Sequence, residues 1–577
     1  MQQNKTTKYN GDLGGILKDG QEVQSKLEKV MDLFFLKKQL SIFDDLKEKG
    51  HHISTLVYGL IIQPFYGFGN IYNMVKAKAA KENKDSYYAA KNNEQIDWRM
   101  FLMLFAKKFT RLVNSRDTMK TNGTTAIIGD DSTLRKTGKK IEKVSMVHDH
   151  VTNTFVLGFK ILVVGYWDGG SFIPLDFSIH REKGSKLRKA KKACSSAKKA
   201  VIKAKDRLKK VEATLQHKQE SASFHRQQVK DNPTNTNIKK LEASIAGKQK
   251  TKQKIIELEK ALLEKEQQYK QSTTEQARVA KKHPEYGLSR KDKKQQFNKK
   301  RATGSFGDKR INEMDQSKID TFISMVKRAV KNGFVPNFVL TDTWFFCQKL
   351  LMEIDKMSAK GIKLLSMAKM GNTMYTMVSN GKAHNAQSLI QIFGRKAKYS
   401  RKLKAHYIKI PATLAGIRIN LFFVKVGGRG KWRLLVTNDL SIGFITMMEV
   451  YQLRWSIEVF FKECKQYLKL GQSCSSDFDG QVADATIAMV QHIMLTFFKR
   501  VNYQQSFGDL FKEISSEMVE SSLAEKLWES FLQVIRILDE VLKIDIMDIH
   551  EETMRNDKAM QLMKQLIFQK STLKNAA

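Results

Sequence analysis

The alternation of hydrophobic and polar residues predicts helices in the first part of the chain. From about Val23 to Val113, apolar residues recur every three or four positions, as in VMDLFFLKKQLSIFDDL and WRMFLMLFAKKFTRLV, and polar turns separate these stretches. This spacing is typical of amphipathic helices that bury one face. It predicts a helical N-terminal domain over residues 1–120.

The pattern becomes extended after the turn TNGTT. The segments AIIGDD, KVSMVHDHV, TFVLGFKILVVGYW and SFIPLDFSI are rich in β-branched and aromatic residues, which favours strands. After residue 310, a helix (SKIDTFISMVKRAVKNG), a strand (FVLTDT) and a second helix (WFFCQKLLMEI) alternate. We therefore expect one α/β domain in two parts, residues 121–180 and 311–370, separated by an insertion.

The insertion, residues 181–310, carries a heptad pattern. Apolar residues alternate spacings of three and four from Leu187 to Leu215, and a weaker stripe resumes after the turn DNPTNTN, from Ile238 to Tyr269. Such spacing is typical of a coiled-coil seam. Two arms joined by a short turn predict an antiparallel coiled-coil hairpin, each arm about 45 residues and so about 65–70 Å long.

The last third of the chain predicts strands and then helices. Strand-like runs HYIKI, IRINLFFVKV and KWRLLVTN indicate a β-rich segment over residues 371–440,. The stretch YQLRWSIEVFFKECK lies in a predicted helical part, residues 441–500. Residues 501–577 again favour helices, for which we expect a role in dimerisation.

Charge narrows the class of partner. The chain has a formal net charge of +42 and a pI near 9.8. Residues 181–310 hold 38 Lys and Arg against 14 Asp and Glu. Such an excess favours a polyanion, with nucleic acid first and an anionic membrane surface second. A DNA-binding role is expected for the N-terminal helices, and phosphate contact for the basic segment 281–301, whose alternative is a solvated linker.

Two observations bear on location. No apolar run is long enough to cross a bilayer, and the N-terminus lacks the apolar core of a secretory signal,. The four cysteines show no paired CxxC spacing, which argues against a disulfide framework or structural zinc. We expect a reduced, cytoplasmic protein that has no membrane span.

Four polar residues interrupt the apolar pattern of YQLRWSIEVFFKECK. On a helix with about 100° per residue, Tyr451, Arg454, Glu458 and Lys465 share a face about 60° wide,. The simplest interpretation is a solvent-facing surface with an Arg–Glu pair at i,i+4. The alternative is a functional wall that presents one carboxylate flanked by two cations and a phenol.

Two further acidic positions follow predicted strands. Asp130 and Asp131 end AIIGDD, and Asp342 ends FVLTD. Ordinary interpretations are a turn aspartate for the first pair and a helix N-cap for Asp342. Together with Glu458, they form a ligand set suited to two divalent cations, Mg²⁺ or Mn²⁺, that promote phosphodiester chemistry. His148 and His150 favour a structural or nucleic-acid-facing role over a metal site.

The quoted helix matches a known signature. Tyr451, Arg454, Glu458 and Lys465 fit the pattern Y-x2-R-x3-E-x6-K, and DDSTLRKTGKK and VLTDTWF stand at residues 130–140 and 339–345. In these features the chain resembles bacterial DDE transposases of the insertion sequence four family, over roughly residues 125–180 and 310–500. The resemblance implies a ribonuclease-H-like catalytic domain with a β-rich insertion ahead of the glutamate helix.

The resemblance also implies roles for individual residues. Asp131, Asp342 and Glu458 would form the catalytic, metal-binding triad. Asp131 is preferred to Asp130 because Ser132 follows it where the family usually has a threonine. DNA-binding residues would be Tyr451, Arg454, Lys465 and Trp432, the last stacking on a flipped base; for Trp432 the alternative is a core strand residue.

The function implied is a DNA transposase. It would cleave at terminal inverted repeats and transfer the ends into target DNA, with hairpin ends as one route. Double-stranded DNA would be its partner, a homodimer its form in the synaptic complex, and the nucleoid its place in the cell. Two alternatives stay open: a ribonuclease-H-like nuclease without strand transfer, and a catalytically inactive DNA-binding coiled-coil scaffold.

Overall fold

The structure is a computed structural model that describes residues 26–46, 49–77, 82–427, 430–501, 506–519 and 555–558. The chain divides into two compact units: residues 1–134, 160–180 and 298–577 form the first, and residues 135–159 and 181–297 form the second. Most of the predicted C-terminal helical region, residues 501–577, lies outside the described residues.

Short helices make up the first described part of the chain. Their bounds are α2 (Lys26–Leu33), α3 (Leu36–Ser41), α4 (Ile53–Ile62), α5 (Ile71–Lys76), α6 (Lys84–Lys91) and α7 (Trp98–Asn114). The last of these, α7, begins where the Asp97 side chain accepts a hydrogen bond from the Met100 amide at 2.9 Å,. It buries Phe101, Phe105 and Phe109 on one face, as the spacing of four predicts.

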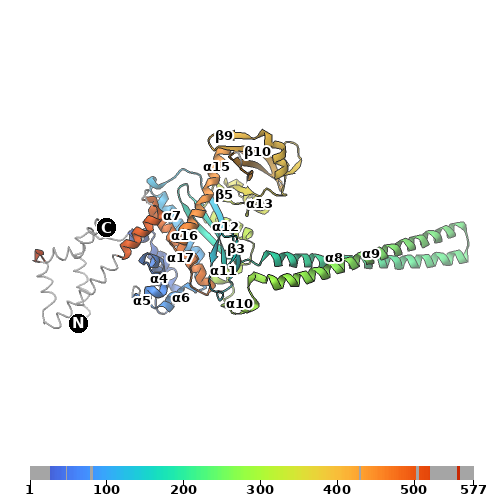
Figure 1. The fold of residues 1–577 in the computed structure, drawn as a ribbon, viewed down its shortest axis with the longest axis horizontal. Helices are drawn as coiled ribbons and strands as arrows, with labels where there is room; N and C mark the ends of the chain where they lie inside the picture. Colours follow the sequence, from blue (N-terminus) through green and yellow to red (C-terminus); the bar gives the residue numbers. More distant parts are fainter. Residues whose placement is uncertain are drawn as a thin grey trace. The chain divides into compact units, whose positions relative to one another are not determined.

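The centre of the first unit is a mixed sheet (Figure 1). Strands β1 (Ala126–Arg135), β5 (Phe338–Thr341) and β6 (Lys363–Ala368) are parallel neighbours, and β12 (Arg433–Thr437) pairs antiparallel with β6. On the other side of β1 comes β3 (Thr154–Trp167), which pairs antiparallel with β4 (Phe172–His180). Every residue of β4 is buried, which accounts for its nearly continuous apolar sequence.

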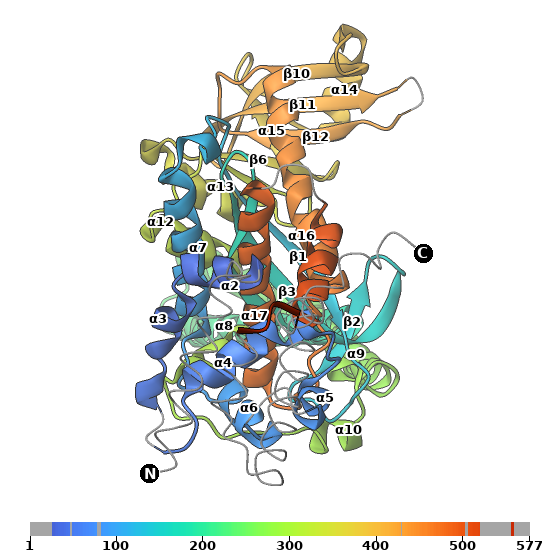
Figure 2. The ribbon, with the colours of Figure 1, turned by 90° about the vertical axis from the view of Figure 1, so that its left-hand side faces the viewer.

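The β-rich segment extends this sheet (Figure 2). Its pieces are β7 (Met374–Met377), β8 (Ala383–Asn385), α14 (Ala386–Phe393), β9 (Lys398–Ser400), β10 (Ala405–Leu414) and β11 (Ile417–Val426). A two-residue turn joins β10 to β11, and both of its residues, Ala415 and Gly416, have positive φ, the backbone that a tight β-hairpin requires. Because β11 pairs with β12, the segment is continuous with the central strands.

Helices cover the sheet. They include α11 (Phe306–Glu313), α12 (Lys318–Lys331), α13 (Gln348–Asp355) and α17 (Phe478–Val501). The long helix α17 is buried along almost its whole length and packs on α7 and β4, which explains why its sequence is apolar on all sides. Beneath these helices, three arginines surround the buried Asp176: Arg99, Arg310 and Arg328.

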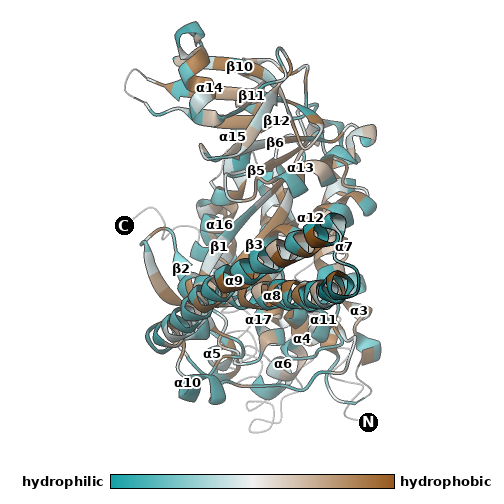
Figure 3. Ribbon diagram, turned by 90° about the vertical axis from the view of Figure 1, so that its right-hand side faces the viewer, coloured by the Kyte–Doolittle hydropathy of each residue, from teal (hydrophilic) through white to brown (hydrophobic). Residues whose placement is uncertain are grey.

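The second unit contains two long helices, α8 (Ser185–Asp231) and α9 (Asn235–Lys282), which lie side by side (Figure 1). Cross-helix contacts join Cys194 to Thr273 at 3.5 Å, Lys205 to Glu266 at 2.9 Å and Lys218 to Thr251 at 2.9 Å, so the helices are antiparallel. Hydrophilic residues predominate along both (Figure 3). Supercoiling of the pair stays a prediction.

The second unit also holds a β-hairpin and a short helix. Strand β2 (Ser145–Asp149) pairs with the first residues of β3, from Thr154 to Gly158. The short helix α10 (Arg290–Lys294) follows α9, and Ser289 caps it. The basic segment 281–301 therefore contains a short 3₁₀ turn, Glu285–Gly287, and the single-turn helix α10.

Candidate active site

Two aspartates meet just beyond the paired residues of the parallel strands β1 and β5. Ile128 lies opposite Leu340 in the register of this pair, and Asp130 and Asp342 each follow two residues later. Equivalent positions on parallel strands project to the same face, so the register brings Asp130 level with Asp342. The predicted end of the strand at Asp131 is wrong, because β1 continues to Arg135.

Asp131 has a different environment. Successive residues of a strand point to opposite faces, and the Asp131 carboxylate pairs with the ammonium of Lys318, at the start of α12. The backbone amide of Asp131 donates to Asp130 Oδ1 at 2.7 Å. The two adjacent aspartates therefore have different partners: Asp131 pairs with Lys318, and Asp130 is level with Asp342 in the register, although the charge of Asp131 also raises the pKa of Asp342.

The pKa values of this pair are raised mainly by burial. Burial, followed by the negative charge of Asp342, raises the pKa of Asp130 to about 7. Burial also raises the pKa of Asp342, although amide hydrogen bonds from Trp344 and Phe345 oppose the change. Two carboxyl groups that resist ionisation together are characteristic of a site for acid–base or metal chemistry.

Asp342 is not a helix N-cap. Its Oδ1 accepts hydrogen bonds from the amides of Trp344 at 2.9 Å and Phe345 at 3.3 Å, within a turn. The predicted helix WFFCQKLLMEI begins only at Gln348, and Cys347 is its cap. The turn fixes the orientation of the Asp342 carboxylate at the end of β5.

The stretch YQLRWSIEVFFKECK forms one helical path of three elements. Helix α15 (Phe444–Gln452) passes through a 3₁₀ turn, Leu453–Trp455, into α16 (Ser456–Gln466) with helical backbone angles throughout. Ile457, Phe460, Phe461 and Cys464 are buried. A 3₁₀ turn within a longer helix often marks a functional position, and Arg454 lies in this one.

The polar side chains of this helix contact β1 and the last residue of β5. Tyr451 Oη donates to the Thr341 carbonyl of β5 at 3.4 Å. Arg454 Nη1 contacts Asp130 Oδ2 at 3.2 Å, and Lys465 Nζ donates to Ser132 Oγ at 2.7 Å and to the Thr133 carbonyl at 2.9 Å. Burial raises the pKa of Tyr451 to about 12. The structure thus brings the helix face and the aspartates together.

Arg454 connects Glu458 to the aspartates. Its Nη2 donates to Glu458 Oε1 while its Nη1 contacts Asp130. Burial lowers the pKa of Arg454, but the hydrogen bond to Glu458 and the nearby anionic groups outweigh burial, so that the net shift is upward. One guanidinium therefore contacts two of the three carboxylates.

These groups offer the hard oxygen ligands that Mg²⁺ and Mn²⁺ prefer. Asp130 and Asp342 fit a divalent cation, because its charge would stabilise carboxylates whose ionisation is opposed mainly by burial and, to a smaller extent, by neighbouring negative charge,. Within the described residues, no three His, Cys, Asp or Glu side chains already converge as a metal site. Glu458 would join the pair once Arg454 releases it.

Trp432 lies at the same edge of the sheet. Leu434 of β12 is opposite Ala368 of β6, and Thr341 of β5 is opposite Ser366. Trp432 precedes β12 and is half-buried. Since β12 runs antiparallel to β6, its first residues lie at the edge where β5 ends.

Three side chains near the aspartates were not predicted from the sequence. Lys318 pairs with Asp131 and lies 5.1 Å from the ring centroid of Trp344. Trp344 is 44% exposed, and Trp455, next to Arg454, is 62% exposed. Exposure of these tryptophans is unusual, because tryptophan is mostly buried in folded proteins. The sequence offered one signal for them, since each stands within two residues of a predicted site residue.

His148 and His150 pack with each other rather than with further ligand side chains. Their rings are 4.8 Å apart, and His148 is 5.2 Å from Phe155. In the described part of the chain, no cluster of metal-ligating residues includes them. The structural interpretation of this pair remains the better one.

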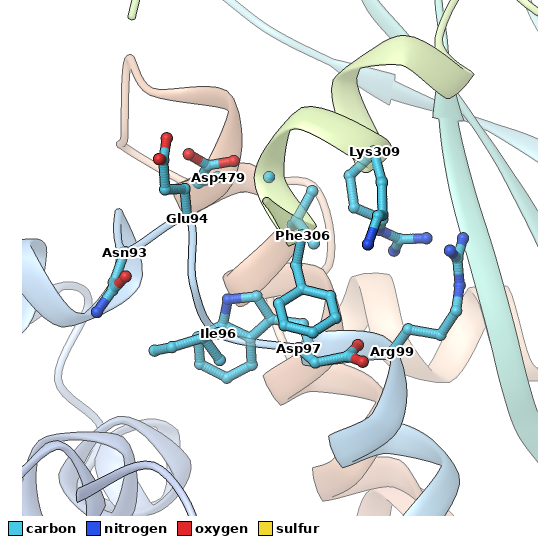
Figure 4. A pocket seen from close by; sticks show the side chains of 12 residues that line it. Asn93, Glu94, Ile96, Asp97, Arg99, Phe306, Lys309 and Asp479 are labelled. Atoms are coloured by element: carbon cyan, nitrogen blue, oxygen red, sulfur yellow. The ribbon is translucent and has the colours of Figure 1, made fainter. Parts of the chain in front are cut away.

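A separate cavity lies between the start of α7, α11 and the start of α17 (Figure 4). It has a volume of about 190 Å³, and Trp98, Phe306 and Asp479 are among its lining residues. Neither the aspartates of β1 and β5 nor the signature residues line it. This cavity is therefore not part of the candidate active site.

Comparisons with known proteins bear on the family of the chain. Among the residues that the structure describes, no helix is long and apolar enough to cross a membrane. No curated protein matches the chain. Residues 252–493 match the family model described as a transposase DDE domain, a range that contains Asp342 and Glu458 but not β1. This match covers less than half of the chain and supports a transposase DDE domain within these residues.

Proposed function

We propose that this protein is an insertion-sequence transposase that cuts DNA at the ends of its element and joins them to a target. The observation that carries the proposal is a convergence just beyond the β1–β5 pairing: Asp130 is level with Asp342, and Arg454 links Asp130 to Glu458. Membership of the insertion sequence four family and its Y-R-E-K signature are part of this proposal.

Asp130, Asp342 and Glu458 would be the catalytic carboxylates. Mg²⁺ or Mn²⁺, two ions in the full site, would supply an activated water or 3′ hydroxyl and stabilise in-line displacement at phosphorus. Asp130 must ionise to serve as a ligand, and its pKa near 7 lets it do so around neutral pH,. Asp131 stays an alternative, but its pairing with Lys318 favours a supporting role.

The cations of the helix would move from protein to DNA contacts. Arg454 is held by two separate carboxylates in the free protein, and a scissile-strand phosphate could bind both of its terminal nitrogens at once. Lys465, fixed on β1, would contact a neighbouring phosphate, while Tyr451 and Trp432 would support an extruded base,. Release of Arg454 would free Glu458 as the third ligand.

The finer features of the reaction belong to the same proposal. We place it on double-stranded DNA at the nucleoid, in the bacterial cytoplasm, with a homodimer holding two ends in a synaptic complex and with hairpin ends as one route. The N-terminal helices would take part in DNA binding. A nuclease without strand transfer would use the same carboxylates, so a joining assay with pre-cut ends distinguishes the two enzymes.

The proposal is tested by Glu458→Gln, which keeps the size and removes the charge. The matched control is Glu449→Gln, on α15 and paired with the exposed Lys402. We expect Glu458→Gln to bind DNA that carries the inverted repeats bordering the gene but to lose Mg²⁺-dependent cleavage by at least about 10³-fold, while the control cleaves normally. Cleavage by Glu458→Gln at the wild-type rate would exclude the assignment. If neutral variants of Asp130, Asp342 and Glu458 all lose cleavage and keep DNA binding, the protein is an enzyme and not an inactive DNA-binding scaffold.

A further inference from the structure

Basic residues are concentrated in the first half of α8. Between Ser185 and Lys210 the sequence has twelve Lys and Arg and one acidic residue, Asp206. The second half of the helix, residues 211–231, is balanced, with three basic and three acidic residues. The excess of positive charge is therefore largest in the first half of α8, although residues 235–256 of α9 also hold six lysines against one acidic residue, Glu242.

All twelve basic side chains in this half are exposed, whereas Leu187, Val201 and Ala204 are buried against α9. At about 100° per residue, five of the twelve fall within about 60° of one another, directly opposite this buried seam. These five, here called the α8 row, are Arg188, Lys192, Lys199, Lys203 and Lys210. The row spans about 33 Å at 1.5 Å per residue.

The acidic residues of α9 do not neutralise the α8 row. Lys205 pairs with Glu266 at 2.9 Å and Lys191 with Glu285 at 3.6 Å, but both lysines lie outside the row. Within the described residues, no member of the row makes an ion pair. Like charges at i,i+4, as in Lys199 and Lys203, destabilise a helix, so the row has a standing electrostatic cost that a polyanion would remove.

We propose that the α8 row binds the sugar–phosphate backbone of duplex DNA along about one helical turn. The length of the row is close to the 34–36 Å of a B-DNA turn. Lysine ammonium groups act as point charges toward phosphate and carry no base readout, so the contact is independent of sequence. An anionic membrane is the weaker partner, because an interfacial helix needs a free apolar face and α9 covers that of α8.

This inference rests on the proposed DNA substrate but not on the catalytic carboxylates. The test uses the full-length protein with Lys192, Lys199 and Lys203 changed to Gln. The matched control changes the exposed Lys254, Lys260 and Lys270 of α9 to Gln, which removes the same charge from a stretch that also contains Glu257, Glu259, Glu264 and Glu266. Neither set touches the buried seam, and circular dichroism checks that both variants keep their helices.

The measurement is affinity for a 30-base-pair duplex of arbitrary sequence as salt is varied. Each lost phosphate contact lowers the slope of log K against log salt by about 0.9, so the row variant should lose about 2.7 and the control less than about 1. Equal slopes in the two variants would overturn the inference and leave the proposed function standing. A wild-type protein that binds no duplex would contradict the proposed function itself. Loss of binding to phosphatidylserine vesicles with unchanged duplex affinity would also overturn the inference.

Discussion

The buried carboxyl of Asp130 should destabilise the metal-free protein at neutral and alkaline pH. An acid whose pKa is higher in the folded than in the unfolded chain favours folding only when it is protonated. The cost of Asp130 is therefore absent below about pH 4, its unfolded pKa, grows as the pH rises, and is complete above about pH 7, its folded pKa,.

The size of this effect follows from the shift. A change from 3.8 to about 7 corresponds to about 4 kcal/mol at about 1.36 kcal/mol per pKa unit, as an upper bound. Asp130→Asn removes the charge and keeps an oxygen that can accept the Asp131 amide, but it loses the ion pair with Arg454. We expect a net gain of about 1–3 kcal/mol at pH 8, or about 2–4 °C in Tm per kcal/mol for a domain of ordinary size.

The assay is thermal unfolding in EDTA at pH 5 and at pH 8, with Asp131→Asn as the neighbouring control. Asp130→Asn should be stabilised more at pH 8 than at pH 5, whereas Asp131→Asn, which loses its Lys318 pair, should not be stabilised. Added Mg²⁺ should raise the Tm of the wild type and leave that of Asp130→Asn nearly unchanged. Destabilisation by Asp130→Asn at pH 8, or a Tm change independent of pH, would show that the buried charge of Asp130 does not destabilise the protein.

Three further expectations follow from the same contacts. Because Asp130 must lose its proton to hold a cation, the initial cleavage rate at fixed subsaturating Mg²⁺ should rise up to about tenfold per pH unit below pH 7 and then level off,; a flat profile from pH 5.5 to 8 would contradict this. Lys465→Ala should lower the free energy of unfolding by about 1–3 kcal/mol in urea titrations, since Ser132 and the Thr133 carbonyl lose a charged donor,; a change below about 0.5 kcal/mol would count against these bonds. Trp455→Ala should leave the free energy of unfolding unchanged, because the ring is exposed. If the ring stacks on a base, the same change should weaken affinity for the element ends by about 1–3 kcal/mol. Val459→Ala, exposed on the next turn, is the control, and equal losses of affinity in the two variants would argue against stacking.

Local periodicity predicted much of what the structure shows in the helix that contains Arg454 and Glu458. The spacing of its polar residues depends only on the 3.6-residue repeat, and the structure directs Tyr451, Arg454 and Lys465 to β1 and to the end of β5. The long helices α8 and α9 were similarly visible, because a heptad pattern is a local signal.

The choice between Asp130 and Asp131 could not be made from local pattern. It depends on the register of β1 against β5, which pairs residues more than 200 positions apart, and a shift of one residue would exchange the faces of the two aspartates. The partnership of Asp131 with Lys318 has the same origin, since α12 is brought to β1 only by tertiary packing. Sequence pattern likewise gave no reason to expect that the β-rich segment continues the central sheet through β11 and β12.

The most direct test of the account compares Asp130→Asn and Asp131→Asn in Mg²⁺-dependent cleavage of a duplex carrying the inverted repeats that border the gene. Both variants remove one negative charge from adjacent positions of the same strand. If Asp130 is the catalytic carboxylate, Asp130→Asn should bind this DNA and fail to cut it, while Asp131→Asn should cut within about tenfold of the wild-type rate. Normal cleavage by Asp130→Asn, with loss of cleavage by Asp131→Asn, would contradict this assignment.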